Sequence, residues 1–566
     1  MEVINLMFLE LSGFPLVLLA IIAFIVILGL IICLHEAGHF FMAKKFDVLC
    51  HDYSIGMGPA IYKKKGKETT FCVRAIPIGG FVSMAGEEAT DDFTKVGTKV
   101  GLNLEDDIVT EIILDDAKDC MVRGEINDKD LDGKDGKDLY ITLMDDMGET
   151  HYYQVSETAT YVFEKNETLQ LAPYHRTFDA KKIWQRLLIL FAGPFMNFVL
   201  AFVLYLIIAF ATGVPNYDSN RVGTVSSGYP AASFLAPGDY ITSVNGVSTK
   251  SWTDFQREMD KIYDNYGTTV NITYSHDNEE HTATMETYTS IVSIGLTNFG
   301  AKDFQLVKIP GTDAFGLEVG KTTLSNGKNS IRYKGEEGTL SKGDYITKVS
   351  IDGTEYTIES WSQIIKLFKE MNVTTSVDVR FEYYDLKDEG TYSLVKLEDC
   401  KSIEPYTDEL LSNQRIEKIA QYIGVAPGYH FSFFECIGEA AKGFWNDFTL
   451  IFRTLGILIA PSSVRQVGVS DLSSVVGIFD MVKQYIGAGF IPLLSLTALL
   501  SVNIGVMNLL PIPALDGGRI VFIIIEGITG KKVPKKVESI INLVFMGLLL
   551  ILFVFITYND ILRLIH

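Results

Sequence analysis

Four long apolar segments constrain the fold of this chain more than any other feature of its sequence. They cover residues 14–41, 187–212, 486–510 and 540–557. A membrane-spanning helix needs about 20 predominantly apolar residues, so each segment is a candidate span. The first segment is unlike a signal peptide, because no basic region precedes it and no small-residue cleavage site follows it. The sequence therefore predicts four transmembrane helices.

The composition indicates that soluble modules accompany these spans. The chain has 566 residues, enough for several domains, and 48% of them are hydrophobic. The formal net charge of -21 argues against a nucleic-acid partner, because binding to phosphates needs a basic surface. The six cysteines include no CxxC pair, so neither a disulfide framework nor a thiolate zinc site is predicted.

Basic residues near the ends of the spans predict their orientation. Lysine and arginine cluster at residues 44–65, at 181–186 and at 531–536. The segment before the first span has none, and region 213–485 has no such cluster at its membrane ends. We therefore expect both termini and region 213–485 to be extracytoplasmic, and the first and third loops to be cytoplasmic.

Region 213–485 contains an internal repeat. The sequence GDYIT at 238–242 recurs at 343–347, and each copy is followed by a glycine turn and a Ser-Trp pair that opens a helical pattern. Each block then closes on an Ile-Gly pair, at 294–295 and at 423–424. This ordered recurrence predicts two copies of one domain.

A further soluble block lies at 90–180, where strand-like runs predict a β-rich insertion. Within it, DKDLDGKDG at 128–136 imitates a calcium loop. An EF-hand needs a glutamate at its twelfth position, where this chain has Leu139. The acidic, glycine-rich stretch is therefore interpreted as a hairpin turn.

Ionisable residues interrupt the first span in the sequence IICLHEAGHFF. At that depth such groups cost roughly 2.5–3.5 kcal/mol each on insertion scales, so they usually have a function. On a helix, His35 and His39 project from one face and can hold one metal ion, while Glu36 can take a proton from water. Two satisfied core histidines are the alternative, which the surrounding apolar residues disfavour.

A catalytic zinc ion needs a third protein ligand. The metzincin pattern would place a histidine at Lys45, and residues 46–67 contain no glutamate on a following helix. Asp516 stands at the end of the third span, after two prolines and before two glycines that permit a tight backbone. A broken helix at membrane depth is tolerated where it is buried or lines a cavity, so Asp516 is a candidate ligand. A turn at the surface is the alternative.

Three motifs in this order resemble the site-2 protease family of intramembrane zinc metalloproteases. They are HEAGH (35–39), FAGPFMNF (191–198) and NLLPIPALDGG (508–518). The similarity is to the bacterial branch with extracytoplasmic PDZ domains, in the form found in Gram-positive bacteria. One departure is Ser474-Val475, where the family usually has Gly-Pro. The resemblance implies Zn²⁺ held by His35, His39 and Asp516, Glu36 as general base, and Asn503 and Asn508 as substrate or oxyanion contacts.

The resemblance also implies a function and partners. It predicts regulated intramembrane proteolysis in the bacterial plasma membrane, with cleavage of the transmembrane segments of membrane-anchored substrates such as anti-sigma factors or signal-peptide remnants. A site-1-type protease acting upstream would be a further partner. Residues 69–86 read as strands turning at Gly79 and Gly80, and an unwound substrate could add to their edge. A simple packing hairpin is the alternative there.

Two other classes of function compete with this one. A catalytically silent PDZ membrane scaffold would have no reason to keep the ligand set, and a metal transporter would need polar pairs along several spans. The predicted fold class is a multi-pass α-helical membrane protein with four transmembrane helices, a membrane-associated β element, a cytoplasmic β-rich insertion and two extracytoplasmic PDZ-like domains. The expected parts are transmembrane helix 1 (14–42), the β element (43–89), the insertion (90–180), helix 2 (187–212), PDZ domain 1 (214–296), PDZ-like domain 2 (297–425), an amphipathic interfacial helix (430–465), helix 3 (486–518) and helix 4 (540–560).

Overall fold

The chain forms two compact units, which are described separately. Unit 1 consists of Met1–Ile208, Ala440–Phe448 and Ser473–His566, and unit 2 of Ala209–Glu439 and Thr449–Leu472. The computed structural model describes residues 14–87, 93–320 and 340–565, except 116, 146, 164–166, 300, 375–376, 389–390, 401, 404, 409–410, 413–416 and 460–473.

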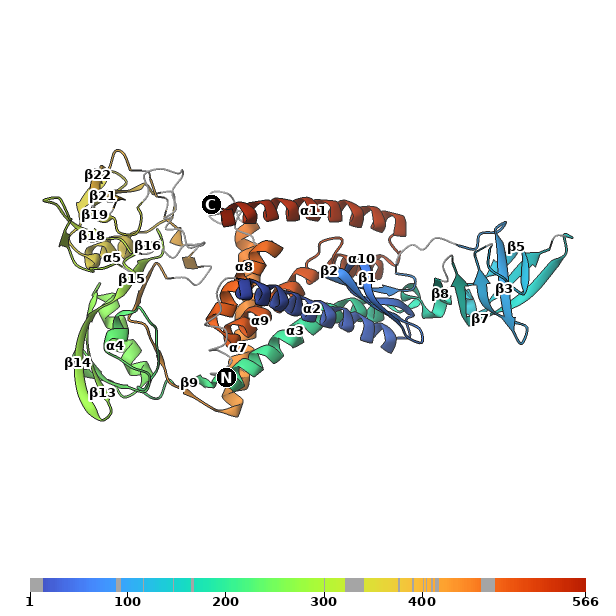
Figure 1. Cartoon of the computed structure of the whole chain (residues 1–566), viewed down its shortest axis with the longest axis horizontal. Helices are drawn as coiled ribbons and strands as arrows, with labels where there is room; N and C mark the ends of the chain where they lie inside the picture. The colour runs from blue at the N-terminus through green and yellow to red at the C-terminus, as the bar shows by residue number, and fades with distance from the viewer. Residues whose placement is uncertain are drawn as a thin grey trace. The chain divides into compact units, whose positions relative to one another are not determined.

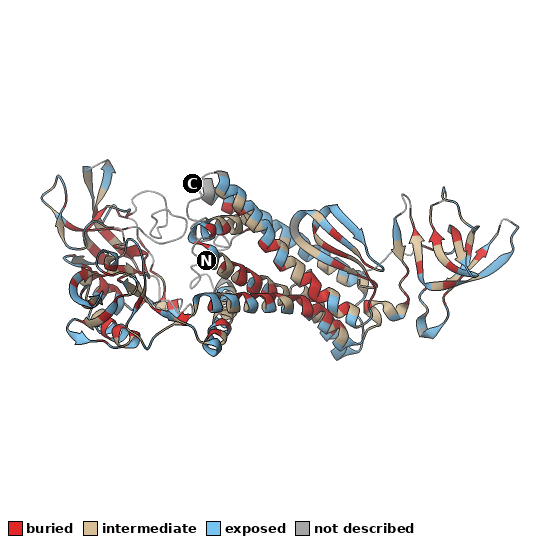
Figure 2. Ribbon diagram, turned by 60° about the horizontal axis from the view of Figure 1, so that its bottom comes forward, coloured by how far each residue is buried: buried red, intermediate tan, exposed pale blue. Residues whose placement is uncertain are grey.

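Each of the four predicted apolar segments is largely helical (Figure 1). Among the described residues, four helices are long and apolar enough to cross a membrane. Figure 2 colours each residue by its burial. In the last of the four helices many large apolar residues are exposed, including Leu543 and Ile551, at 73% and 68%. Such a surface is unfavourable in water and suits lipid. The four helices are α2 (Phe14–Lys45), α3 (Ile183–Thr212), α9 (Phe490–Leu509) and α11 (Lys535–Ile565).

The third predicted span, 486–518, is wrong at both ends. Helix α9 ends at Leu509, and Asp516 begins a separate helix, α10 (Asp516–Thr529). At the other end, Gly489 separates α9 from α8 (Val475–Ala488), a helix that we did not predict. Ser474 caps α8 by accepting a hydrogen bond from the main-chain N–H of Val476. The Ser474-Val475 pair, which stands where the family usually has Gly-Pro, therefore begins a helix.

The predicted amphipathic helix corresponds to α7 (Phe433–Ile459). Its middle part packs on α3, where the Phe444 and Phe448 rings both lie 5.9 Å from the Phe198 ring. Tyr205 of α3 also donates a hydrogen bond to Asp447. This part of α7 is therefore anchored to a candidate span.

Strands β1 (Cys50–Lys65) and β2 (Thr70–Met84) form the predicted β element. Both strands fold back on themselves. Residues 52–55 pair on one side with 80–83 and on the other with 70–73, while 60–65 pair with 70–74. Residues 80–84 are therefore an outer edge of this sheet, because their pairing within it is on one side only.

The insertion is β-rich, as predicted. Its sheet order is β4-β3-β5-β6-β7-β8, and β4 also pairs with β7, so the first five strands close into a barrel. Val100, Ile126 and Ile141 lie in its core. The acidic stretch at 128–136 connects the antiparallel pair β5–β6, which confirms the hairpin interpretation. The elements are β3 (Lys99–Glu105), β4 (Ile108–Ile113), β5 (Val122–Asp130), η1 (Lys134–Gly136), β6 (Tyr140–Met144), β7 (Thr150–Val162), β8 (Thr168–Gln170), η3 (Tyr174–Arg176) and η4 (Phe178–Ala180).

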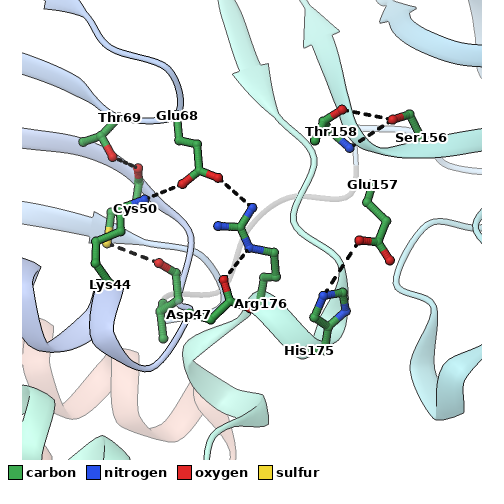
Figure 3. A network of polar contacts seen from close by, with 11 residues as sticks. Lys44, Asp47, Cys50, Glu68, Thr69, Ser156, Glu157, Thr158, His175 and Arg176 are labelled. Atoms are coloured by element: carbon green, nitrogen blue, oxygen red, sulfur yellow. Dashed lines mark hydrogen bonds and ion pairs between the residues drawn. The ribbon is translucent and has the colours of Figure 1, made fainter.

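A polar network joins the end of α2 to the β element and to the segment after the barrel (Figure 3). The Glu68 carboxylate accepts from Lys44 at 2.7 Å and lies 2.9 Å from Arg176, which also contacts Asp47 at 3.1 Å. The hydrogen bonds from Arg176 and Lys44 lower the pKa of Glu68 to about 2, so this carboxylate is ionised at neutral pH.

Unit 2 contains the two predicted repeats. In both, a serine caps a helix that begins with tryptophan: Ser251 accepts from Asp254 N, and Ser360 from Gln363 N. Repeat one contains β10 (Val222–Val225), η5 (Pro230–Ser233), β11 (Tyr240–Val244), β12 (Val247–Ser248), α4 (Trp252–Asp264), β13 (Thr269–His276) and β14 (Glu279–Glu286). Repeat two contains β17 (Val307–Lys308), β18 (Phe315–Glu318), β19 (Tyr345–Ile351), β20 (Thr354–Thr357), α5 (Trp361–Glu370), β21 (Val379–Asp388) and β22 (Thr391–Val395).

The predicted boundary between the repeats, 296/297, differs from the strand pairing. Strand β24 (Val425–Pro427) pairs with β10 and so completes repeat one, although it follows repeat two in the chain. Ile294 and Leu296, expected in repeat one, lie in the core of repeat two. Repeat two is therefore inserted into repeat one before its last strand. Ile423 of the second Ile-Gly pair lies in the core of repeat one, so each pair belongs to the copy other than the one predicted.

Three further strands lie at this junction. Strand β15 (Tyr288–Ile291) pairs with both β16 (Leu296–Thr297) and β23 (Ile419–Tyr422), and Ile291 shares the core of repeat two with Ile365 of α5. In repeat one, a groove of about 350 Å³ lies between α4 and residues 421–426. Strands β9 (Val214–Pro215) and β25 (Tyr429–His430) form an antiparallel pair.

Candidate metal centre and active site

The two histidines of the first motif converge with Asp516 in unit 1. Their four-residue spacing on α2 places both rings on one face, and both side chains are buried. The Nε2 atoms of His35 and His39 lie 3.2 Å apart. Asp516 Oδ2 lies 3.2 Å from the first and 3.3 Å from the second. The structure thus brings together the three predicted ligands, from opposite ends of the chain.

The geometry of this triangle fits zinc. Ligand atoms bound at about 2.0–2.1 Å to a tetrahedral zinc ion lie about 3.3 Å apart, which is the separation found here. Asp516 Oδ2 is buried and has no hydrogen-bond partner among the described residues. His39 Nδ1 donates to the Ile189 carbonyl at 2.8 Å, which leaves a lone pair on Nε2. Lone pairs that converge in this way favour a metal cation between them. Three protein ligands leave the fourth tetrahedral position open.

The turn between α9 and α10 positions Asp516. Its left-handed residue is Ala514, with φ of 77°, rather than either of the two glycines. The glycines instead allow close approach of the backbone. A Cβ on Gly517 would lie 2.2 Å from the Leu510 carbonyl oxygen, and one on Gly518 would lie 2.4 Å from that of Ile512. The predicted tight backbone is therefore present. The left-handed conformation is at Ala514, and the two glycines contribute the close approach of neighbouring main chain.

Glu36 follows His35 on α2 and is buried beside the edge of the β element. A Cβ on Gly80 would lie 2.9 Å from Glu36 Cγ and 2.8 Å from Ile32 Cγ2. Only a glycine lets the edge strand pass this close to the helix. Gly79 has a positive φ of 71° and faces Met57 rather than the metal centre.

The two asparagines predicted to contact the substrate, Asn503 and Asn508, lie on α9. Asn503 is exposed on α9, and Asn508 is half-buried in its last turn. No described contact joins either side chain to the three ligands, so their roles stay predictions.

Sequence reasoning missed two residues of the motif FAGPFMNF. A Cβ on Gly193 would lie 2.2 Å from His39 Nε2, so this glycine makes room for the ring. Asn197 is fully buried, and its Nδ2 lies 3.3 Å from His35 Nδ1. An asparagine inside an apolar span was the signal that could have identified the second of them.

Ion pairs hold α10 in place around this centre. Arg519, one turn after Asp516, pairs with Glu87 just beyond β2. Arg186 of α3 makes a two-pronged contact with Glu526 of α10, at 2.9 and 2.7 Å. Bidentate pairs of this kind fix geometry as well as charge. They connect the helix that carries Asp516 both to the β element and to α3.

Comparison with known proteins agrees with this geometry. The family model of peptidase family M50 matches residues 23–552. The regulator of sigma-W protease RasP of Bacillus subtilis is 29% identical over 550 residues, covering 96% of this chain and 98% of that protein. The zinc metalloprotease RasP of Bacillus licheniformis is also 29% identical, over 96% of this chain and 99% of its own. That of Shouchella clausii is 28% identical with the same coverage.

Solved structures also match, and one example covers a smaller part of the chain. It is the PDZ domain of the SdrC-like protein from Listeria monocytogenes, which is 36% identical and covers 13% of this chain and 76% of its own, with a TM-score of 0.12. A score this low does not compare the folds, so the PDZ assignment of the repeats stays a prediction. The family match, by contrast, spans nearly the whole chain. The chain therefore belongs to peptidase family M50, the site-2 protease family, and is a zinc metalloprotease.

Proposed function

We propose that this metalloprotease cleaves peptide bonds within the membrane, in transmembrane segments of membrane-anchored proteins. The observation that carries the proposal is the place of the three ligands. His35 and His39 lie inside α2, a helix of 32 mostly apolar residues, and Asp516 follows the end of α9, another candidate span. A substrate bond that reaches this centre must therefore come from a membrane-embedded segment.

The residues have distinct roles in this proposal. His35, His39 and Asp516 hold the zinc ion, which when bound supplies Lewis-acid activation of water and of the peptide carbonyl. Glu36 takes the proton of the attacking water and then gives it to the leaving amine. Its burial next to the ligands places its carboxylate where bulk water cannot compete for that proton.

The edge strand 80–84 offers a way to present the substrate. A transmembrane helix hides its carbonyls in its own hydrogen bonds and must unwind before cleavage. An unwound segment that adds to residues 80–84 recovers main-chain hydrogen bonds. Because Gly80 lies against Glu36, the added strand would run beside the proposed base.

Purified full-length protein tests the main proposal. In detergent it should bind one zinc ion per chain and cut a model single-span substrate at a bond inside the span, as located by mass spectrometry. A chelator should abolish the cut and added zinc should restore it. Stoichiometric zinc without any cleavage would favour the membrane scaffold instead.

Proline substitutions test the edge strand. Phe81→Pro and Val82→Pro should each slow cleavage of a helical substrate, most strongly where the lost N–H points outward, because an added strand pairs through the main chain. Phe81→Ala and Val82→Ala are matched controls that shorten the side chain but keep the N–H. A substrate weakened by glycine or proline near its cut site should lose less, and zinc content should not change. Equal rates for each proline–alanine pair would leave the strand as packing only.

The relatives suggest a substrate class. One of them is named as the regulator of sigma-W protease, so we place membrane-anchored anti-sigma factors first among candidate substrates and signal-peptide remnants second. A site-1-type protease that shortens the substrate beforehand is the proposed upstream partner. The setting is a bacterial plasma membrane, with both termini and region 213–485 extracytoplasmic.

Cysteine labelling checks this orientation. A cysteine at Ser248, exposed in β12, should react with a membrane-impermeant thiol reagent on intact cells. One at Ser539, exposed near the start of α11, should react only after the cells are opened. Labelling is measured over the background of the native cysteines, of which Cys33 and Cys120 are half-buried and the other four buried. The reverse pattern would invert the proposed topology.

A further inference from the structure

The two histidine ligands differ in how their second ring nitrogen is held. His39 Nδ1 faces the Ile189 carbonyl, which can only accept a hydrogen bond, so the proton of that ring is on Nδ1. His35 Nδ1 faces the Asn197 amide, with Nδ2 as the nearer atom at 3.3 Å. The nitrogen and oxygen of an amide exchange places when it turns by about 180° about its terminal bond, and their assignment follows from the hydrogen-bond network.

The surroundings of Asn197 show how its amide is held. The side chain is fully buried, and Oδ1 has no hydrogen-bond partner within the described part of the chain. Its main-chain oxygen accepts a hydrogen bond from Ser501 of α9 at 2.8 Å, which holds the backbone in place. The amide therefore stands opposite His35 with an acceptor that is unused.

We infer that Asn197 is a positioning residue for His35, with its amide turned so that Oδ1 accepts the Nδ1 proton. This rests on the proposed ligand set. A proton on Nδ1 leaves the lone pair of His35 on Nε2, aimed at His39 and Asp516. In the opposite orientation Nδ2 would donate to Nδ1, the neutral ring would carry its proton on Nε2, and that proton would point into the metal position. Outer partners of this kind fix both the tautomer and the orientation of a ligand ring.

Zinc affinity of the purified full-length protein tests the inference without using activity. The dissociation constant is measured by competition with a chelator for wild type, Asn197→Leu, Asn197→Asp and Ser501→Ala. Loss of the amide in Asn197→Leu should weaken zinc binding about 10–100-fold, as for other outer partners of ligands. Asn197→Asp should bind within a few-fold of wild type, because a carboxylate can also accept from Nδ1–H. Ser501→Ala removes a neighbouring bond but keeps the amide, and should match wild type.

Two results would overturn the inference. One is wild-type affinity in a folded Asn197→Leu. The other is a loss in Asn197→Asp beyond tenfold, which would show that the amide donates to His35. Should Asn197→Leu fail to fold, the aspartate variant decides alone. Failure of the ligand set itself looks different, because wild type would then bind no stoichiometric zinc, or Asp516→Asn would bind it normally.

Discussion

Replacing Glu36 by glutamine should abolish peptide-bond cleavage and leave zinc bound. The amide keeps the size and shape of the side chain but cannot carry the proton, and loss of a general base typically costs about 10²–10⁴-fold in rate. Glu36 is not among the three converging ligands, so metal content should stay at the wild-type level. The measurement is turnover of a single-span substrate together with zinc per chain.

A matched control keeps this result specific. Glu105→Gln makes the same chemical change at an exposed position at the end of β3, in the barrel, and should leave turnover unchanged. Turnover of Glu36→Gln within tenfold of wild type would assign the base to another residue. Loss of zinc from that variant would make Glu36 part of the metal site.

Asp516→Asn should weaken zinc binding and activity together. A neutral amide is a poor zinc ligand beside two imidazoles, so the dissociation constant should rise by more than the 10–100-fold expected for outer partners. Asp560→Asn is the control. That buried aspartate of α11 accepts hydrogen bonds from the main-chain N–H groups of Ser474 and Gly477, far from the histidines in sequence. Its loss should lower stability but not zinc affinity. Normal zinc binding by Asp516→Asn would remove Asp516 from the ligand set.

Much of the metal centre was predictable because its chemistry conflicts with its surroundings. His35 and His39 stand out in an apolar helix at a spacing that has one common use. Asp516 stands out because prolines and glycines surround it where a span should continue. Asn197 was missed as a single residue, because an uncharged amide in an apolar run is a weaker signal, and only its contact with His35 reveals a use.

Helix ends and sheet order were less predictable, for physical reasons. The apolar segment 486–510 runs from the last residues of α8 into α9, and the break between the two helices depends on Gly489, whose φ of 116° is a property of the folded chain. The predicted strand pair within 69–86, turning at Gly79 and Gly80, is wrong in its pairing, because residues 70–73 and 80–83 lie on either side of 52–55 and do not pair with each other. Periodicity shows that residues are extended, but it does not show which strands pair.

The insertion of repeat two within repeat one determines the order in which unit 2 can be completed. During synthesis, strand β24 emerges only after all of repeat two, so repeat one waits for its last strand while repeat two can already close its core. The chain enters and leaves repeat two at neighbouring points, because Tyr288 of β15 pairs with Tyr422 of β23. A gene fragment that stops at residue 296 would therefore encode repeat one without its final strand, and the smallest separable piece of this region contains both repeats.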